Sequence, residues 1–163
     1  MTGLAKDVDE RGAEWAPLRD RPQVRPHHVG ISVADLEDSI AWYERFLGFE
    51  LESVVPVPED EGRVAMLVSG GGFRVELFEL PQAAPLPADR RHPATDLRTH
   101  GIKHVAYEVD GIEDWQERLR RLGADIVWDL RVHEDVKVLF LRDSTGNLVE
   151  LVEPLKGMKG TTP

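Results

Sequence analysis

The sequence contains no cysteine. Disulfide bonds, thiolate nucleophiles and cysteine ligands for a metal are therefore excluded together. Basic side chains are also in the minority, because 20 lysines and arginines stand against 30 aspartates and glutamates, for a formal net charge of -10. Such a charge disfavours nucleic acid and anionic membrane surfaces as partners, since both attract basic proteins. Any metal site in this chain has to be built from histidine and carboxylate side chains.

Long apolar runs are missing as well. No stretch approaches the roughly 20 consecutive apolar residues that a membrane-spanning helix needs, and the start of the chain lacks the apolar core of a signal peptide. We therefore expect a cytoplasmic protein. A hydrophobic content of 41% over 163 residues still suffices for a buried core. Residues 1–25 show weak periodicity and are expected to form an N-terminal tail, and residues 156–163 a C-terminal one.

An alternating pattern begins at His28. The stretch HVGISV places polar and apolar side chains on opposite sides, as a half-buried strand does. Asp35 then provides the N-cap of a predicted helix that ends at Gly48. Three more strand-like stretches follow, FELESVVPV, RVAMLVS and FRVELFEL, and three glycines separate the last two. Residues 26–80 are thus predicted to form a module with the order strand, helix and three strands.

Residues 102–155 repeat this order. KHVAYEV is a strand-like stretch before a predicted helix that starts at an Asp110 cap and ends at Gly123, and ADIVWDLRV, VKVLFLR and LVELVEP follow. The similarity between VELFELP and LVELVEP is the clearest sign of duplication. Residues 81–101 hold four prolines and join the modules, so we expect an extended surface connection that could also cover a site. The sequence predicts an α+β fold of tandem β-α-β-β-β modules.

Two residue types recur at the first and last strands of both modules. His28 and Glu76 stand there in the first module, and His104 and Glu150 in the second, with nearly the same separation along the chain. If each first strand lies near its last, and a pseudo-twofold relates the modules, the four side chains surround one point. Two neutral imidazoles and two carboxylates balance a divalent cation. The alternative to a metal site is that these four are unrelated surface residues, with Arg74 and Glu76 forming an ion pair.

Other polar residues give weaker signals. His27 aligns only with Lys103 in the repeat, so it is predicted to have no metal role. His133 either borders the site or is a solvated loop residue. Arg131 and Lys137 could meet an anionic substrate, or they could be ordinary surface charges on alternating strands.

The duplicated module resembles the vicinal oxygen chelate superfamily in HHVGISVADLEDSIAWYERFLGFEL at one end and GNLVELVEP at the other. That superfamily includes glyoxalase I, methylmalonyl-CoA epimerase, extradiol dioxygenases, fosfomycin-resistance enzymes and bleomycin-binding proteins. The resemblance covers roughly residues 25–155 and implies a cupped, mixed and mainly antiparallel sheet, the glyoxalase/bleomycin resistance/dioxygenase fold. It also implies a homodimer, and a divalent metal (Zn²⁺, Ni²⁺, Co²⁺, Mn²⁺ or Fe²⁺) with the ligands His28, Glu76, His104 and Glu150.

The same resemblance implies a chemistry. The metal would chelate adjacent oxygens of a small substrate and stabilise an enolate or endiolate while a glutamate takes a proton, Glu150 being the first candidate and Glu76 the second. This is a metal-dependent lyase or isomerase of the glyoxalase and epimerase type. Two alternatives stay open: an Fe(II) extradiol-type dioxygenase using His28, His104 and Glu150, and a non-catalytic protein of the same fold that binds an antibiotic or another small molecule.

Overall fold

The computed structural model of the chain describes residues 24–155, so the two predicted tails fall outside the described residues apart from Val24 and Arg25. The first module contains β1 (His28–Ser32), α1 (Leu36–Trp42), a π-helical turn (Tyr43–Leu47), β2 (Glu50–Val57), a 3-10 turn (Pro58–Asp60), β3 (Gly62–Val68) and β4 (Arg74–Glu79). The second contains β5 (Val105–Glu108), α3 (Ile112–Leu122), β6 (Asp125–Val132), β7 (Val136–Arg142) and β8 (Leu148–Pro154).

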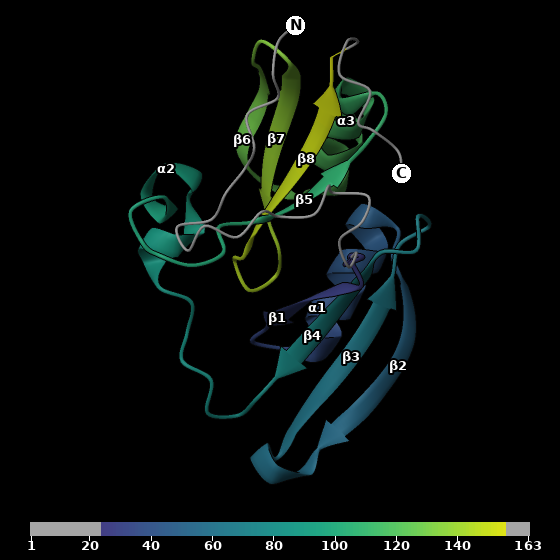
Figure 1. Cartoon of the computed structure of the whole chain (residues 1–163), viewed down its shortest axis with the longest axis vertical. Helices are drawn as coiled ribbons and strands as arrows, with labels where there is room; N and C mark the ends of the chain where they lie inside the picture. The colour runs from purple at the N-terminus through teal and green to yellow at the C-terminus, as the bar shows by residue number, and fades with distance from the viewer. Residues whose placement is uncertain (1–23, 156–163) are drawn as a thin grey trace, which may run out of the picture.

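Each module forms one four-stranded mixed sheet (Figure 1). The strand orders are β1-β4-β3-β2 and β5-β8-β7-β6, which are the same order in both modules. The first strand of each module runs parallel to the last, and the other neighbours are antiparallel. The predicted α+β duplication is confirmed, and the first strand of each module does lie beside the last.

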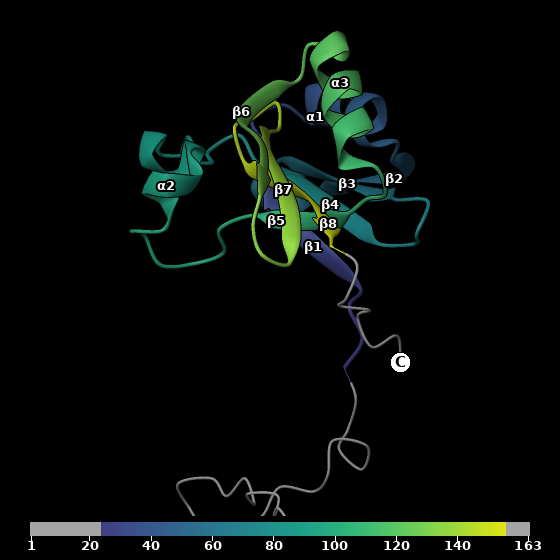
Figure 2. The ribbon, with the colours of Figure 1, turned by 90° about the horizontal axis from the view of Figure 1, so that it is seen from above.

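One face of each sheet packs on its helix. The fully buried side chains include Leu36 of α1 with Leu77 of β4, and Leu119 of α3 with Leu151 of β8. All four belong to a single core cluster that spans both modules. Figure 2 shows α1 and α3 above the same side of the strands. The opposite face, which carries Gly30 and Ala106, is called the open face below.

The two helices begin differently. Asp35 is the N-cap of α1 and accepts a hydrogen bond from the Asp38 backbone N–H (2.8 Å). The predicted Asp110 cap of α3 is wrong: Gly111 occupies the N-cap position, with φ of 69°, and makes no side-chain cap. The Glu153 carboxylate on β8 takes that role, because it accepts from the Gly111 backbone N–H at 3.0 Å. No helix of the described residues is long and apolar enough to cross a membrane.

The connection between the sheets is folded rather than extended throughout. It contains a 3-10 turn (Ala88–Arg91) and the short helix α2 (Pro93–Asp96), which stand to one side of the sheets in Figures 1 and 2. Pro93 suits the first turn of a helix because its φ is already fixed near the helical value. The Asp96 carboxylate is 1% exposed and forms salt bridges with Arg90 and Lys103. A buried carboxylate with two cationic partners fixes this segment in a defined shape.

Candidate active site

Each module brings its histidine to its glutamate on the open face. The distance from His28 Nε2 to Glu76 Oε2 is 3.4 Å, and that from His104 Nε2 to Glu150 Oε2 is 3.0 Å. The strand register explains the pairing, since Glu76 lies opposite Gly30 on β1 and Glu150 lies opposite Ala106 on β5. In both modules the glutamate therefore lies beside the residue that follows the histidine by two positions on the neighbouring strand, so both side chains point to the same face. The duplicated residues form duplicated contacts.

The structure forms two pairs and does not join them into one tight group. Among the described residues, no three of the four predicted ligands place their ligand atoms within 4.8 Å of one another. Each module thus contributes one imidazole and one carboxylate as a unit. A centre with all four ligands needs the two units to come together.

The second pair lies in the drier surroundings. The Glu150 side chain is 15% exposed, against 25% for Glu76. Burial raises the pKa of the Glu150 carboxyl above its ordinary value, while the neighbouring His104 and His133 act to lower it. His133, in the turn between β6 and β7, therefore lies close enough to influence this carboxylate, as the sequence allowed.

Aromatic rings border the second pair on the open face. The His104 ring meets Phe140 edge-on at 5.2 Å between centroids, and Phe140 meets Trp128 at 5.4 Å. His92 from the connection meets Trp128 at 5.8 Å. The Arg131 guanidinium lies over the Trp128 ring, 3.7 Å from its centroid. A series of contacts thus leads from His104 through the rings of Phe140 and Trp128 to the Arg131 guanidinium.

The structure shows which basic residues lie next to the first His–Glu pair. Arg74 binds Glu52 (2.7 Å) rather than Glu76, so the ion pair between Arg74 and Glu76, which the sequence left open as an alternative, does not form. Arg74 donates from Nε and Nη2 to the two oxygens of Glu52, at 2.7 and 2.8 Å, while Glu76 contacts His28. His27 lies beside the pair, with its Nδ1 2.7 Å from His28 Nδ1.

Lys137 is turned away from the site. Its ammonium binds Glu113 of α3 (2.8 Å) and Glu153 of β8 (3.0 Å), on the helix side of the second sheet. Of the two basic residues that could meet an anionic substrate, only Arg131 lies on the open face.

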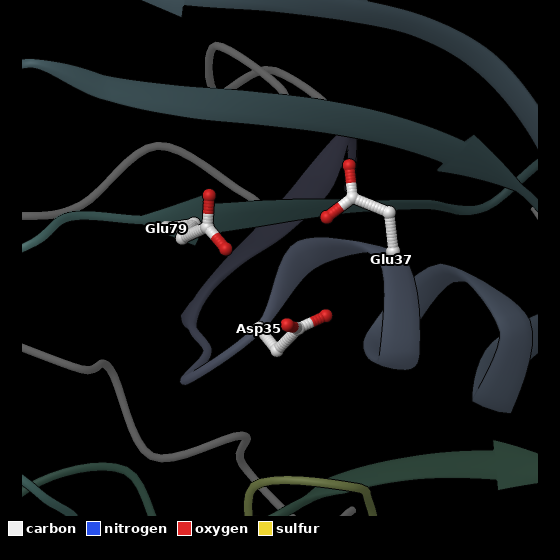
Figure 3. A group of neighbouring side chains, drawn as sticks. All are labelled: Asp35, Glu37 and Glu79. Carbon is white, nitrogen blue, oxygen red and sulfur yellow. The ribbon is translucent and has the colours of Figure 1, made fainter.

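A second cluster of carboxylates stands where β4 ends and α1 begins (Figure 3). The oxygens of Asp35, Glu37 and Glu79 lie within 4.8 Å of one another, the only such group of three potential ligands within residues 24–155. Arg63 donates hydrogen bonds to Glu37 (2.8 Å) and to Glu79 (2.6 and 2.9 Å). Glu79 also accepts from the Leu36 backbone N–H at 3.0 Å. The cluster is an ion-paired brace between sheet and helix.

The second module contains the same brace, made of Lys137, Glu113 and Glu153. Glu153 accepts from the backbone N–H at the start of α3, as Glu79 does at the start of α1. Neither brace was predicted from the sequence. A signal was present, because VELFELP and LVELVEP each contain two glutamates, and only the first of each pair lies on the open face.

A cavity of about 990 Å³ opens beside His104 of the second pair. Its walls come from β1, the connection and the turn between β7 and β8, and they include His104, Ser32, Arg91 and Thr145. The volume is that of a small-molecule site. His104 is therefore reachable from a space large enough for a substrate.

Comparisons with known proteins agree with this fold. Residues 25–151 match the family model described as "Glyoxalase/Bleomycin resistance protein/Dioxygenase superfamily". The chain is 33% identical to an ethylmalonyl-CoA/methylmalonyl-CoA epimerase of Cereibacter sphaeroides, over 78% of this chain and 96% of that protein. It is 30% identical to the mitochondrial methylmalonyl-CoA epimerase of Homo sapiens, over 78% and 72% respectively.

A solved structure has the same fold. The crystal structure of a glyoxalase family protein from Bacillus cereus superimposes with a TM-score of 0.65 and 23% identity, over 85% of this chain and 99% of that one. The likeness to this structure concerns the arrangement of strands and helices.

Proposed function

Because the chain belongs to the glyoxalase/bleomycin resistance protein/dioxygenase superfamily, we propose that it is a divalent-metal-dependent enzyme of the glyoxalase and epimerase type. It is a lyase or isomerase that moves a proton on a small substrate with two adjacent oxygens. The observation that carries this proposal is the His–Glu contact repeated at equivalent positions of both modules. Similarity to proteins named as epimerases supports the reaction type.

The residues fit a divalent cation. Two ligand atoms that each lie about 2.1 Å from one ion are separated by roughly 3 to 3.5 Å, and the His–Glu contacts of 3.4 and 3.0 Å have this spacing. Two imidazoles and two carboxylates offset a charge of 2+. The ligands in the proposal are His28, Glu76, His104 and Glu150. When bound, the ion supplies Lewis-acid polarisation of the substrate's adjacent oxygens.

Glu150 is the first candidate for the base and Glu76 the second. A carboxylate that stands next to the bound oxygens can take a proton from the neighbouring carbon without further movement of the substrate. The Glu150 carboxylate is the less exposed of the two, and the rings of Phe140 and Trp128 limit the approach of water on one side. Without a bound ion, His104 Nε2 contacts one oxygen of Glu150 at 3.0 Å, which keeps the carboxylate pointed toward the position that the ion would take.

The test begins with the metal. Protein expressed with Zn²⁺, Ni²⁺, Co²⁺, Mn²⁺ or Fe²⁺ is analysed for bound metal, and its affinity is titrated. His104→Ala and Glu150→Gln are expected to weaken metal binding by about tenfold or more, since each removes a ligand. His100→Ala and Glu117→Gln change the same residue types at exposed positions of the connection and of α3, and serve as controls. Unchanged affinity in both site variants would refute the site.

The same variants test the reaction. Methylmalonyl-CoA and ethylmalonyl-CoA, the substrates named for the relatives, are incubated with metal-loaded protein in D₂O, and exchange of the proton next to the carbonyl is followed by NMR. We expect exchange with the wild type and its loss in Glu150→Gln. Oxygen consumption with a catechol by the Fe(II)-loaded protein, without such exchange, would indicate the dioxygenase alternative instead.

The proposal includes a homodimer in the cytoplasm. The family resemblance supports the dimer, and the composition supports the compartment. Because the two His–Glu pairs are separate units, a dimer offers a second way to join them. Sedimentation of the metal-loaded and metal-free protein tests the assembly.

A further inference from the structure

The two open faces differ at the positions next to the His–Glu pairs. Strand register places one row of residues across each sheet, with the glutamate in the middle of the row. The rows are Ser53, Met66, Glu76 and Gly30 in the first module, and Trp128, Phe140, Glu150 and Ala106 in the second. A glutamate and a small residue occur in both rows, whereas the other two positions hold large rings in the second module only. Residues that differ between otherwise matched modules are the natural place for recognition of a substrate.

Arg131 is held beside this row by Trp128. Two bulges in β6, on either side of Trp128, bring residues 128 and 131 to the same face although their spacing is odd. The guanidinium stacks on the ring at 3.7 Å, a cation–π contact that orients its plane. Phe140 and His92 pack against the same indole and fix it in turn. A guanidinium held in this way loses less freedom when it binds a ligand.

Arg131 differs from the other arginines of the open faces in its charge partners. Arg74 is bound to Glu52, and Arg142 to Asp125. Within the described residues, no carboxylate lies within 4.0 Å of the Arg131 guanidinium. The Arg131 side chain is exposed, so its donors face solvent. The guanidinium fork matches the two oxygens of a carboxylate or a phosphate.

We propose that Arg131 binds an anionic oxygen group, a carboxylate or a phosphate, at the end of a substrate whose adjacent oxygens lie at the His104–Glu150 pair. The inference rests on the proposed function, which supplies the first of these two contacts. Between them lie the rings of Phe140 and Trp128, in successive contacts of 5.2, 5.4 and 3.7 Å. The substrate class is therefore an elongated anion with chelating oxygens at one end, an apolar middle and a second anionic group at the other.

The probes are pairs of 2-oxo acids that differ only in the far end. Each of 2-oxoglutarate, 2-oxoadipate and 2-oxopimelate is compared with the mono-acid of the same chain length, and oxalate provides the chelating oxygens alone. Affinities for the metal-loaded full-length protein are measured by calorimetry. We expect at least one diacid to bind about tenfold or more tightly than its mono-acid, the size of effect for a charge-assisted pair. A phosphonate of the best length distinguishes phosphate from carboxylate recognition.

Variants locate the effect. Arg131→Gln is expected to abolish the diacid advantage, Arg131→Lys to retain part of it, and Trp128→Leu to reduce it because the platform is lost. Arg121→Gln removes the same charge from an exposed position of α3 and is expected to keep the full advantage. If Arg131→Gln does not fold, Arg131→Lys and Trp128→Leu still decide, since a full diacid advantage in both would overturn the role of Arg131.

Two failures can be told apart. Oxalate that does not bind to metal-loaded protein overturns the proposed function, and the role of Arg131 falls with it. Oxalate that binds while no diacid of any length outcompetes its mono-acid overturns the role of Arg131 alone. If a diacid still binds more tightly than its mono-acid in Arg131→Gln, the role of Arg131 is likewise overturned.

Discussion

Asp143 organises the turn between β7 and β8 with a single carboxylate. Its Oδ1 accepts from the backbone N–H groups of Thr145 (2.9 Å), Gly146 (2.8 Å) and Asn147 (2.8 Å). The residue is 5% exposed, so water cannot easily replace these contacts. Burial raises the pKa of the Asp143 carboxyl, and the hydrogen bonds oppose that rise. The carboxylate therefore shapes the turn through acceptor geometry.

Asp143→Ala is predicted to lower the free energy of unfolding by about 3 kcal/mol, because three backbone donors lose a charged acceptor in a largely buried place. Asp143→Asn keeps one acceptor oxygen and should lose less. Urea unfolding at neutral pH measures both values. A loss below about 0.5 kcal/mol in Asp143→Ala would mean that the turn keeps its shape without the carboxylate.

Single residues also show where sequence reasoning reached its limit. The four candidate residues could be selected because the repeat aligns them, and the His–Glu contact within each module forms, while their metal role stays a prediction. The position of Arg131 could not be derived, because strict alternation puts residues 128 and 131 on opposite faces. The bulges in β6 put both residues on the same face, and the sequence ADIVWDLRV contains no local signal that predicts a bulge.

At the scale of helices and strands, each module ties its helix to its sheet with an ion-paired brace. In the second module the Lys137 ammonium holds the pKa of Glu113 and of Glu153 below the ordinary value of 4.5. In the first module Arg63 lowers the pKa of Glu37 in the same way. Both braces are open to solvent at least in part, so their energy is modest. Their effect is best seen through its dependence on pH.

The brace predicts a pH dependence with a definite sign. Since the folded pKa values of Glu113 and Glu153 lie below the unfolded value of 4.5, the unfolded chain binds more protons as the pH falls through that value. The free energy of unfolding should therefore decrease with falling pH between about pH 5 and pH 3. Lys137→Met is expected to make this decrease shallower. Thermal unfolding measured across that range gives the two slopes.

The control for this prediction is Arg121→Met, which removes an exposed cation of α3. That variant should leave the slope close to that of the wild type. Equal slopes for wild type and Lys137→Met would contradict the brace as a source of the pH dependence.

The elements were largely predictable, with one exception. The strands and both helices followed from alternation and the repeat, and the start of α1 also from its Asp35 cap. The connection was expected to be extended because of its four prolines, whereas Ala88–Arg91 and Pro93–Asp96 are helical turns. Prolines at the start of a turn favour it, and the buried Asp96 with its two cations supplies the tertiary contact that composition does not reveal.

The whole molecule is held by a core that both modules share. The Tyr107 ring of β5 meets Phe49 and Phe73 of the first module at 5.5 and 6.1 Å between centroids. The Arg118 side chain on α3 donates to the Phe46 carbonyl oxygen (2.8 Å). The buried side chains on the helix-side faces of both sheets belong to one core cluster. The assembly of the modules followed from the repeat, but these interface contacts depend on side-chain packing and could not be read from either module alone.

Unfolding is therefore predicted to occur in one transition. Tryptophan fluorescence and far-UV circular dichroism should give coincident urea curves. Phe49→Ala, which removes an interface ring, should shift both curves together, with a loss of about 3 kcal/mol or more. Ile40→Val, a smaller change of a half-buried residue in α1, serves as the control. Two separate transitions would show that each module is stable by itself.

The braces and the His–Glu pairs lie on opposite faces of the same strands. Glu79 and Glu153 secure the helices, while Glu76 and Glu150 stand on the other side, three residues earlier in the chain. Mutations at Trp128 or its counterpart Ser53 can thus accumulate without touching the contacts that fasten the helices. A gene with this layout can change what its product recognises over evolutionary time while the inherited scaffold stays in place.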